Sequence, residues 1–516
     1  MTEPTIAILD FGSQYAQLIA RRVREQHVHS RLFAPGVRPA ELRAAGVVGI
    51  ILSGGPASTY DSAAPRLDAT ILDMGCPVLG ICYGLQILAE TLGGRVSAGA
   101  TREFGRARLT IHASDALLAH VPPESNVWMS HGDVVESVSD QFESLASTPA
   151  CPMAVVRHKM LPIRGAQFHP EVTHTAYGAQ IIRNFLYDIC RCAGTWRTQD
   201  IVRHAIDDIR ARVAPDARVI CGLSGGVDSS VVAALLHEAV RDRLTCIFVD
   251  HGLLRSNEAD LVEATFRDHF KTDLHVVDAA ERFFARLRGV TDPQEKRRRI
   301  GHEFIEVFKA EATRIPNARY LAQGTLYPDV IESGHGHAGT TASIKLHHNV
   351  GGLPAELGFE LIEPLRDLFK DEVRQMGELL GLPREIVWRH PFPGPGLAVR
   401  ILGEVNPERC DLLRRADAIV TEEIRSAGWY DKIAQAFAVL LPVATIGVMG
   451  DGRTYAGQHV LVLRFVQTTD FMTAEWVHID PIVLDRISTR VVNEVRGINR
   501  VTYDITTKPP ATIEWE

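Results

Sequence analysis

The sequence predicts an α/β protein in which two parallel-sheet α/β domains precede a small α+β domain. Short apolar segments alternate with helix-length segments in two series, the first beginning at residues 6–9 and the second at residues 219–221. This alternation is typical of parallel sheets covered by helices. A segment dense in Pro and Gly at 390–397 excludes regular helix and strand and marks a domain boundary. The helix-length segment and the strand-like runs after it indicate a compact α+β unit.

The composition is that of a globular protein with about three or four domains. The chain has 516 residues, of which 46% are hydrophobic and 23% charged, and its net charge of −8 argues against a nucleic-acid-binding surface. Eight cysteines form no disulfide framework over this length and favour a reducing compartment. The longest apolar run, 436–449, contains Pro442 and is too short for a bilayer. With no signal-peptide pattern, we expect a cytoplasmic protein that binds neither membrane nor nucleic acid.

The first domain is expected over residues 5–193. Its candidate strands, in a mostly parallel sheet, are 6–9, 48–52, 78–81 and 127–129. Its sharpest feature is Cys82, which stands between Gly80 and Gly84 where the third strand ends and a helix begins. Glycines on both sides permit the strained turn of a nucleophile elbow, and the helix N-terminus favours a thiolate. The alternative is a small buried cysteine before a helix.

His169 and Glu171 are candidates for the general base that Cys82 would need. Pro170 biases the chain toward an extended conformation, in which side chains two positions apart point to the same side. Glu171 can therefore orient the His169 imidazole, as in a catalytic triad. The backbone N–H groups of the turn at 53–56, after the second strand, are candidates for an oxyanion site, with a plain Gly-Pro turn as the alternative.

Five motifs of this domain resemble class I glutamine amidotransferases. The resemblance implies that Cys82 attacks the side-chain amide of glutamine, that His169 transfers the proton and that Glu171 orients the histidine. It also implies that the N–H groups of Gly55 and Tyr83 stabilise the oxyanion, and that the products are glutamate and ammonia. The motifs are Asp10–Gln14, Ser53–Pro56, Gly80–Gly84, Ser130–Asp133 and Phe168–Glu171.

The second domain is expected over residues 194–391 and contains the glycine-rich segment 223–230 between an apolar strand and an apolar helix. Backbone N–H groups and hydroxyls at a helix N-terminus form an anion site, and the usual anion is phosphate. No Gly-Lys-Ser/Thr ends the segment, so it is not a Walker A loop. A glycine turn capped by Asp and Ser is the alternative. The segment resembles the pyrophosphate loop of ATP pyrophosphatases, which implies ATP binding by Ser224, Gly225, Gly226, Val227, Asp228, Ser229 and Ser230.

The same resemblance extends to a lysine and two aspartates. Lys370 begins a helix and resembles a family lysine that reaches the ATP phosphates, with a solvated helix lysine as the alternative. Asp228 and Asp329 are candidates to hold Mg²⁺ with the phosphates, although an aspartate at a turn is often only a cap. The basic run at 286–299 is interpreted as a solvated helix face, with contact to phosphates or to a partner domain as the alternative.

The third domain is expected over residues 392–516. Its motifs Phe392–Leu397, Gly450–Arg453 and Lys508–Glu516 resemble those of glutamine-hydrolysing GMP synthases, and the motif order agrees over nearly the whole chain. The resemblance implies a ligase that forms a C–N bond with glutamine as the nitrogen donor. ATP with Mg²⁺ adenylates XMP, ammonia aminates C2, and GMP, AMP and pyrophosphate are released. It further implies XMP binding by Lys508 and Glu514, and a homodimer formed through this domain.

Three other functions are weighed against this one. A tRNA-thiolating enzyme shares the pyrophosphate loop, but it needs a basic RNA-binding domain and a late persulfide cysteine, and this chain is acidic. A regulatory module without catalysis is disfavoured by the intact Cys82, His169 and Glu171. Another glutamine-dependent synthetase, such as one acting on deamido-NAD, is disfavoured by the motifs of the third domain.

Overall fold

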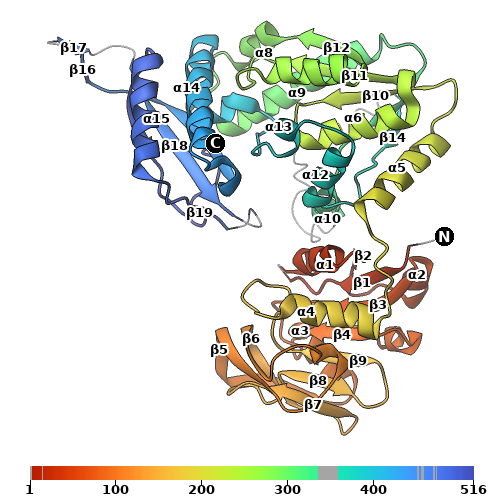
Figure 1. Cartoon of the computed structure of the whole chain (residues 1–516). Coiled ribbons are helices and arrows are strands. Elements are labelled where there is room, and N and C mark those ends of the chain that lie inside the picture. The colour runs from red at the N-terminus through yellow and green to blue at the C-terminus, as the bar shows by residue number, and fades with distance from the viewer. Residues whose placement is uncertain are drawn as a thin grey trace. The chain divides into compact units, whose positions relative to one another are not determined.

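The computed structural model describes residues 3–13, 15–334, 358–449, 452–454, 458–468, 471 and 473–516. Gln14, Gly450 and Asp451, which belong to motifs named above, lie outside these residues. The chain divides into two compact units, residues 1–201 and 202–516, and each is described by itself (Figure 1). Within the described ranges, no helix has both the length and the apolar character needed to cross a membrane.

The first unit is built on a nine-stranded mixed sheet in the order β2-β1-β3-β4-β9-β8-β7-β5-β6. The parallel half consists of β1 (Thr5–Leu9), β2 (His29–Phe33), β3 (Val47–Leu52), β4 (Val78–Ile81) and β9 (Ile163–Ala166). The antiparallel half consists of β5 (Arg95–Ile111), β6 (Glu124–Ser137), β7 (Phe142–Ser147) and β8 (Val155–His158). The main helices are α1 (Ala16–Glu25), α2 (Pro39–Ala44), α3 (Tyr83–Thr91) and α4 (Gly178–Asn184).

Three of the four strands predicted for this unit are the parallel strands β1, β3 and β4, but the fourth was misplaced. Residues 127–129 lie inside β6, which pairs antiparallel with β5 at the far edge of the sheet. Buried and more exposed residues alternate through the middle of β6, as expected for a strand with one face toward the core. The short apolar stretch at 127–129 resembled a buried parallel strand because its flanks face solvent.

The second unit begins with a five-stranded sheet in which every adjacent pair is parallel, in the order β12-β11-β10-β13-β14. In chain order this is 3-2-1-4-5, so the order reverses between β10 and β13, where ligands bind at the carboxyl ends of the strands. The strands are β10 (Arg218–Leu223), β11 (Leu244–Asp250), β12 (Asp273–Asp278), β13 (Ala318–Ala322) and β14 (Glu360–Ile362). Helices near it include α5 (Thr198–Arg212), α6 (Val227–Val240), α9 (Pro293–Ala312), α10 (Tyr327–Gly334), α12 (Lys370–Leu379) and α13 (Arg384–Val387).

The rest of this unit is the predicted α+β part. Strands β15 (Gln435–Ala444), β18 (His459–Gln467), β19 (Glu475–Trp476) and β20 (Ile498–Tyr503) form its sheet, with helices α14 (Pro407–Ser426) and α15 (Pro481–Glu494). Many of its buried residues belong to the same hydrophobic core as those of the five-stranded sheet, from Ile220 and Leu253 to Leu413 and Leu461. The other face of its sheet has a small cluster of its own, which includes Phe437 and Val462. This shared core explains why the two parts form one compact unit. The predicted fold class, α/β with a smaller α+β part, is therefore confirmed.

Candidate active sites

Cys82 lies at a strained turn between β4 and α3. Its backbone has φ +52°, a conformation that side-chain-bearing residues rarely adopt. A Cβ atom on Gly80 would lie 2.6 Å from the Gly84 carbonyl group, and one on Gly84 would lie 2.3 Å from the Leu52 carbonyl oxygen. Both flanking positions therefore require glycine because the backbones of β3, β4 and α3 meet there. The turn has the backbone form of a nucleophile elbow.

His169 and Glu171 lie next to this cysteine. The His169 Nδ1 atom is 2.7 Å from Glu171 Oε1, and both side chains are buried. Burial opposes protonation of His169, but the Glu171 carboxylate and a side-chain hydrogen bond with Cys82 outweigh it and raise the His169 pKa to about 11. The His169 backbone is fixed by the Thr175 hydroxyl, which donates to its carbonyl oxygen at 2.6 Å. The spacing of two residues therefore brings the Glu171 carboxylate into hydrogen-bond contact with the His169 imidazole.

The turn after β3 lies against the same two side chains. A Cβ atom on Gly54 would lie 3.2 Å from His169 Cε1 and 3.8 Å from Cys82 Cβ. Gly55 packs as tightly against the end of β1, where an added Cβ would lie 2.8 Å from the Phe11 carbonyl oxygen. Tyr83 is the first residue of α3, so its N–H has no intrahelical acceptor. The structure therefore brings the predicted oxyanion residues to the elbow.

Two polar side chains near Cys82 were not singled out in the sequence. Gln167 Nε2 lies 3.7 Å from Cys82 Sγ, and His131 is buried with its Nε2 atom 3.4 Å from Glu103 Oε2. The main effect on the His131 pKa is burial, which lowers it. His131 belongs to the quoted segment 130–133, but its pairing with Glu103 depends on the β5–β6 hairpin, which the local sequence did not predict.

The predicted anion loop lies at the carboxyl end of β10, beside the point where the strand order reverses. Gly225 has φ +72°, and the hydroxyls of Ser224 and Ser229 are 3.1 Å apart. Ser224 N–H also donates to Ser229 Oγ at 3.1 Å, which closes the turn onto the first turn of α6. The Ser230 hydroxyl is buried, and it has no hydrogen-bond partner in the part of the chain that the structure describes.

Two further segments reach this loop. Lys370, the first residue of α12, forms an ion pair with Asp228 in which Nζ lies 2.5 Å from Oδ2. The turn after β13 is close as well, since a Cβ on Gly324 would lie 3.1 Å from Asp228 Cβ. The structure thus places the exposed Lys370 side chain at the loop, where it pairs with Asp228.

The two aspartates proposed for magnesium differ in environment. The Asp228 carboxylate is partly exposed at the loop, whereas an oxygen of Asp329 accepts the Leu326 N–H at 3.0 Å and so caps a turn before α10. Among the described residues, no group of three or more His, Cys, Asp or Glu could hold a metal by itself. Mg²⁺ that arrives on phosphates needs only one or two protein carboxylates, and Asp228 fits that requirement.

Three arginines that the sequence did not single out surround the Phe392 ring. The guanidinium carbons of Arg255, Arg389 and Arg400 lie 4.8, 5.8 and 5.1 Å from its centroid. Each comes from a different segment: the turn after β11, the residues after α13, and a short turn at 396–400. Nη2 of Arg255 and Nη1 of Arg400 are buried without a hydrogen-bond partner in the described ranges. Each guanidinium is paired with a carboxylate of the chain. The cluster therefore offers a ligand its unpaired N–H groups and not a net positive charge.

Glu514 belongs to this arginine cluster, but Lys508 is bonded elsewhere. Arg400 binds the Glu514 carboxylate through two nitrogens, at 2.8 and 3.1 Å, and Gln435 Nε2 donates to it at 2.7 Å. Lys508 Nζ donates to the Phe471 carbonyl oxygen at 2.6 Å. The two residues predicted to act together on XMP therefore have separate partners in the structure.

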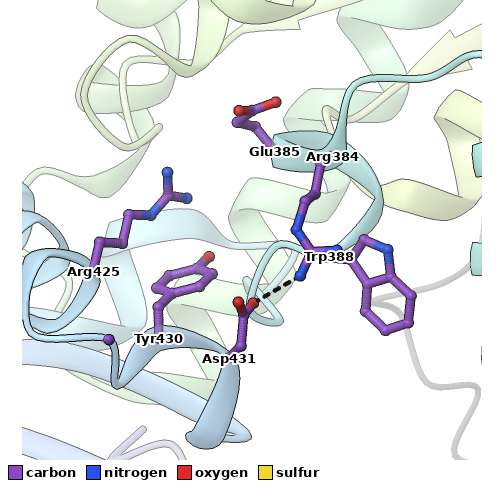
Figure 2. Close-up of a pocket in the computed structure, with 7 residues that line it drawn as sticks. Arg384, Glu385, Trp388, Arg425, Tyr430 and Asp431 are labelled. Atoms are coloured by element: carbon purple, nitrogen blue, oxygen red, sulfur yellow. Dashed lines mark hydrogen bonds and ion pairs between the residues drawn. The ribbon is translucent and has the colours of Figure 1, made fainter.

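A separate cavity of about 270 Å³ lies between α13 and the end of α14 (Figure 2). Arg384 and Asp431 form an ion pair across it, with 3.2 Å between Nη2 and Oδ1. The Arg425 guanidinium lies over the Tyr430 ring, 4.3 Å from its centroid. Charge within the chain compensates Arg384, and in the described part of the chain no residue lining this cavity has a buried polar side-chain atom without a hydrogen-bond partner.

Comparison with known proteins gives one consistent result. Three family models match: glutamine amidotransferase class-I at residues 7–189, asparagine synthase at residues 202–295, and GMP synthase C terminal domain at residues 422–515. A GMP synthase [glutamine-hydrolyzing] from Azoarcus sp. (strain BH72) is 54% identical over 100% of both chains. Proteins with the same name from Caldanaerobacter subterraneus subsp. tengcongensis and from Synechococcus sp. are 52% and 53% identical, over 99% of this chain and 99% and 96% of their own.

Replacement of Gly84 by Ala tests the elbow. Its Cβ would overlap the Leu52 carbonyl oxygen, so β3 and α3 must separate. We expect a loss of about 1–3 kcal/mol in the free energy of unfolding, together with loss of activity at Cys82. Chemical denaturation measures the first effect. Gly36→Ala is the matched control, because an added Cβ there meets nothing within 4 Å. Equal stability of the two variants would contradict the close approach.

The raised pKa of His169 predicts a pH dependence. Its folded value, about 11, exceeds the ordinary value of 6.5, so protonation stabilises the folded state. This contribution is fully present below about pH 6.5 and is lost as the pH rises through 11. The difference in unfolding free energy between the wild type and His169→Gln should therefore shrink from pH 6.5 toward pH 11, as measured by urea denaturation. A difference that grows over this range would show that the pKa is not raised.

Proposed function

The chain belongs to the family of glutamine-hydrolysing GMP synthases, and from this premise we propose which of its residues carry the two half-reactions. It is a ligase that hydrolyses glutamine and uses the ammonia, with ATP, to convert XMP into GMP. The observation that carries the residue assignment is the geometry at Cys82, where a strained turn, a buried imidazole and a buried carboxylate meet.

In the first half-reaction, Cys82 Sγ attacks the side-chain amide carbon of glutamine. His169 holds the proton that leaves the thiol and delivers it to the departing ammonia, while Glu171 favours the imidazolium form. The N–H groups of Gly55 and Tyr83 stabilise the negative oxygen of the tetrahedral intermediate. Water then hydrolyses the thioester at Cys82 and releases glutamate, with His169 as the base.

In the second half-reaction, the loop from Ser224 to Ser230 binds the β- and γ-phosphates of ATP. The C2 oxygen of XMP attacks the α-phosphorus, pyrophosphate leaves, and ammonia displaces AMP from C2. Lys370 exchanges its Asp228 partner for a phosphate oxygen. When bound, Mg²⁺ neutralises phosphate charge, and Asp228 is the residue that would help to hold it.

We place XMP against the arginine cluster. Its phosphate and purine accept hydrogen bonds, and the buried N–H groups of Arg255 Nη2 and Arg400 Nη1, which have no hydrogen-bond partner among the described residues, are donors for them. Glu514 lies in the same cluster and can accept hydrogen bonds from the purine. Lys508 would have to leave the Phe471 carbonyl oxygen before it could contact the nucleotide.

The remaining assignments follow the sequence prediction. Residues 5–193 are assigned to glutamine hydrolysis, 194–391 to adenylation and 392–516 to XMP binding and dimerisation. Exposed Val443 and Ile446 in the last of these support a dimer contact. All eight cysteines are free thiols in the structure, which supports a cytoplasmic location.

Replacement of Cys82 by Ala should separate the two half-reactions. Glutamine-driven GMP synthesis should fall by about 10³-fold or more, because the nucleophile is lost. Synthesis driven by ammonium should keep most of its rate, because the adenylation residues are untouched. Formation of GMP and AMP from XMP and Mg-ATP is measured with each nitrogen source. Equal loss with both sources would contradict the assignment of Cys82 to glutamine hydrolysis alone.

Replacement of Lys370 by Met should have the complementary effect. Loss of the positive charge at the phosphate loop should lower synthesis by about 10²-fold with either nitrogen source. Hydrolysis of glutamine in the absence of ATP should be unchanged. Arg366→Gln, which removes an exposed cation paired with Glu363, is the control. If Lys370→Met lowers only the glutamine-driven rate, Lys370 does not act on ATP.

A further inference from the structure

The tail of the chain, defined here as residues 505–516, is held by three cationic side chains that are all 0% exposed, and Arg297 also donates to the main-chain oxygen of Glu516. Arg464 of β18 donates to two carbonyl oxygens of the tail, and Arg400 binds Glu514. The third cation, Lys296, comes from α9 of the parallel-sheet part. The tail therefore joins the two parts of the second unit, and Figure 1 shows the C-terminus where they meet.

Lys296 is fully engaged in this junction. Its Nζ atom donates to the Ile401 carbonyl oxygen at 2.7 Å and to the Ala398 carbonyl oxygen at 3.3 Å, and it forms an ion pair with Glu516. The Glu516 side chain is only 7% exposed. Because a buried ammonium needs a charged partner and several hydrogen bonds, this arrangement offsets the cost of burying Lys296.

The position of Lys296 places it on the buried face of α9 and not on the solvated face. In α9 it is aligned with Ile300 and Val307, which are also buried. Its neighbour Arg298 is exposed and pairs with Glu295. The interpretation of the run 286–299 as a solvated helix face is therefore wrong for Lys296, and the alternative of contact with a partner domain is the correct one there.

We infer that Lys296 is a positioning residue for the XMP site. It holds the carbonyl groups on either side of Arg400 and, at the same time, the residue two positions after Glu514. Lys296, which belongs to the parallel-sheet part, therefore restrains the backbone next to Arg400 and the backbone next to Glu514 at the same time. This inference rests on the proposed placement of XMP beside Glu514.

The test compares Lys296→Met and Glu516→Gln with the wild type in ammonium-driven synthesis. Loss of the Lys296–Glu516 contact should raise the KM for XMP by about tenfold in both variants, since Glu514 then keeps only its side-chain contacts with Arg400 and Gln435. The KM for ATP and the glutaminase rate should change less than about twofold. Hydrogen exchange should rise in the tail and remain unchanged in the five-stranded sheet. Glu516→Gln removes a charge without removing bulk, so it carries the test if Lys296→Met fails to fold.

Two controls make the result decisive. Arg298→Gln, in the same basic run, should leave the KM for XMP unchanged, and the Lys296→Met/Glu516→Gln double variant should be no worse than Lys296→Met alone. Glu514→Gln tests the proposed XMP site itself. If it raises the KM for XMP and the other two variants do not, the inference about Lys296 is wrong. If Glu514→Gln leaves the KM for XMP unchanged, the proposed placement of XMP is wrong.

Discussion

Both candidate sites depend on the same constraint, a parallel strand that ends in a tight turn in which glycine is required directly before a helix. At Cys82, the carbonyl groups of Leu52 and Gly84 leave no space for a Cβ on either flanking residue. At the phosphate loop, Gly225 supplies a left-handed conformation before α6. In each case the turn delivers a helix N-terminus, with its unpaired N–H groups, to the position where negative charge develops or binds.

The two sites differ in how their polar residues are assembled. The residues around Cys82 follow strands that are adjacent in one sheet, so the sheet register alone brings them together. The arginine cluster instead draws on the turn after β11, the residues after α13 and the tail. Its assembly depends on the hydrophobic core shared by the α/β and α+β parts. Damage to that core should therefore disturb the arginine cluster, where we propose that XMP binds, before it disturbs the loop at 224–230.

This difference also explains what the sequence could predict. Cys82, the His169–Glu171 spacing and the loop at 224–230 are local signatures, because a few neighbouring residues dictate each turn. The convergence of Arg255, Arg389 and Arg400 needs tertiary structure that no local pattern carries, and the antiparallel β5–β6 hairpin was missed for the same reason. The sequence does contain a sign that Lys296 is buried, because its helical spacing places it on the same face as Ile300 and Val307. The four consecutive cations at 296–299 instead suggest a solvated, charged face.

The energetics of two ion pairs accounts for their different tasks. Lys370 and Asp228 are 45% and 30% exposed, and a pair of that kind contributes only about 0–1 kcal/mol. Lys370 can therefore leave Asp228 for a phosphate at little cost. Lys296 and Glu516 are 0% and 7% exposed, and loss of one partner of such a pair costs about 3–5 kcal/mol. Burial thus distinguishes the two lysines: under the proposed mechanism Lys370 is free to change partners, and Lys296 is a fixed support for the proposed XMP site.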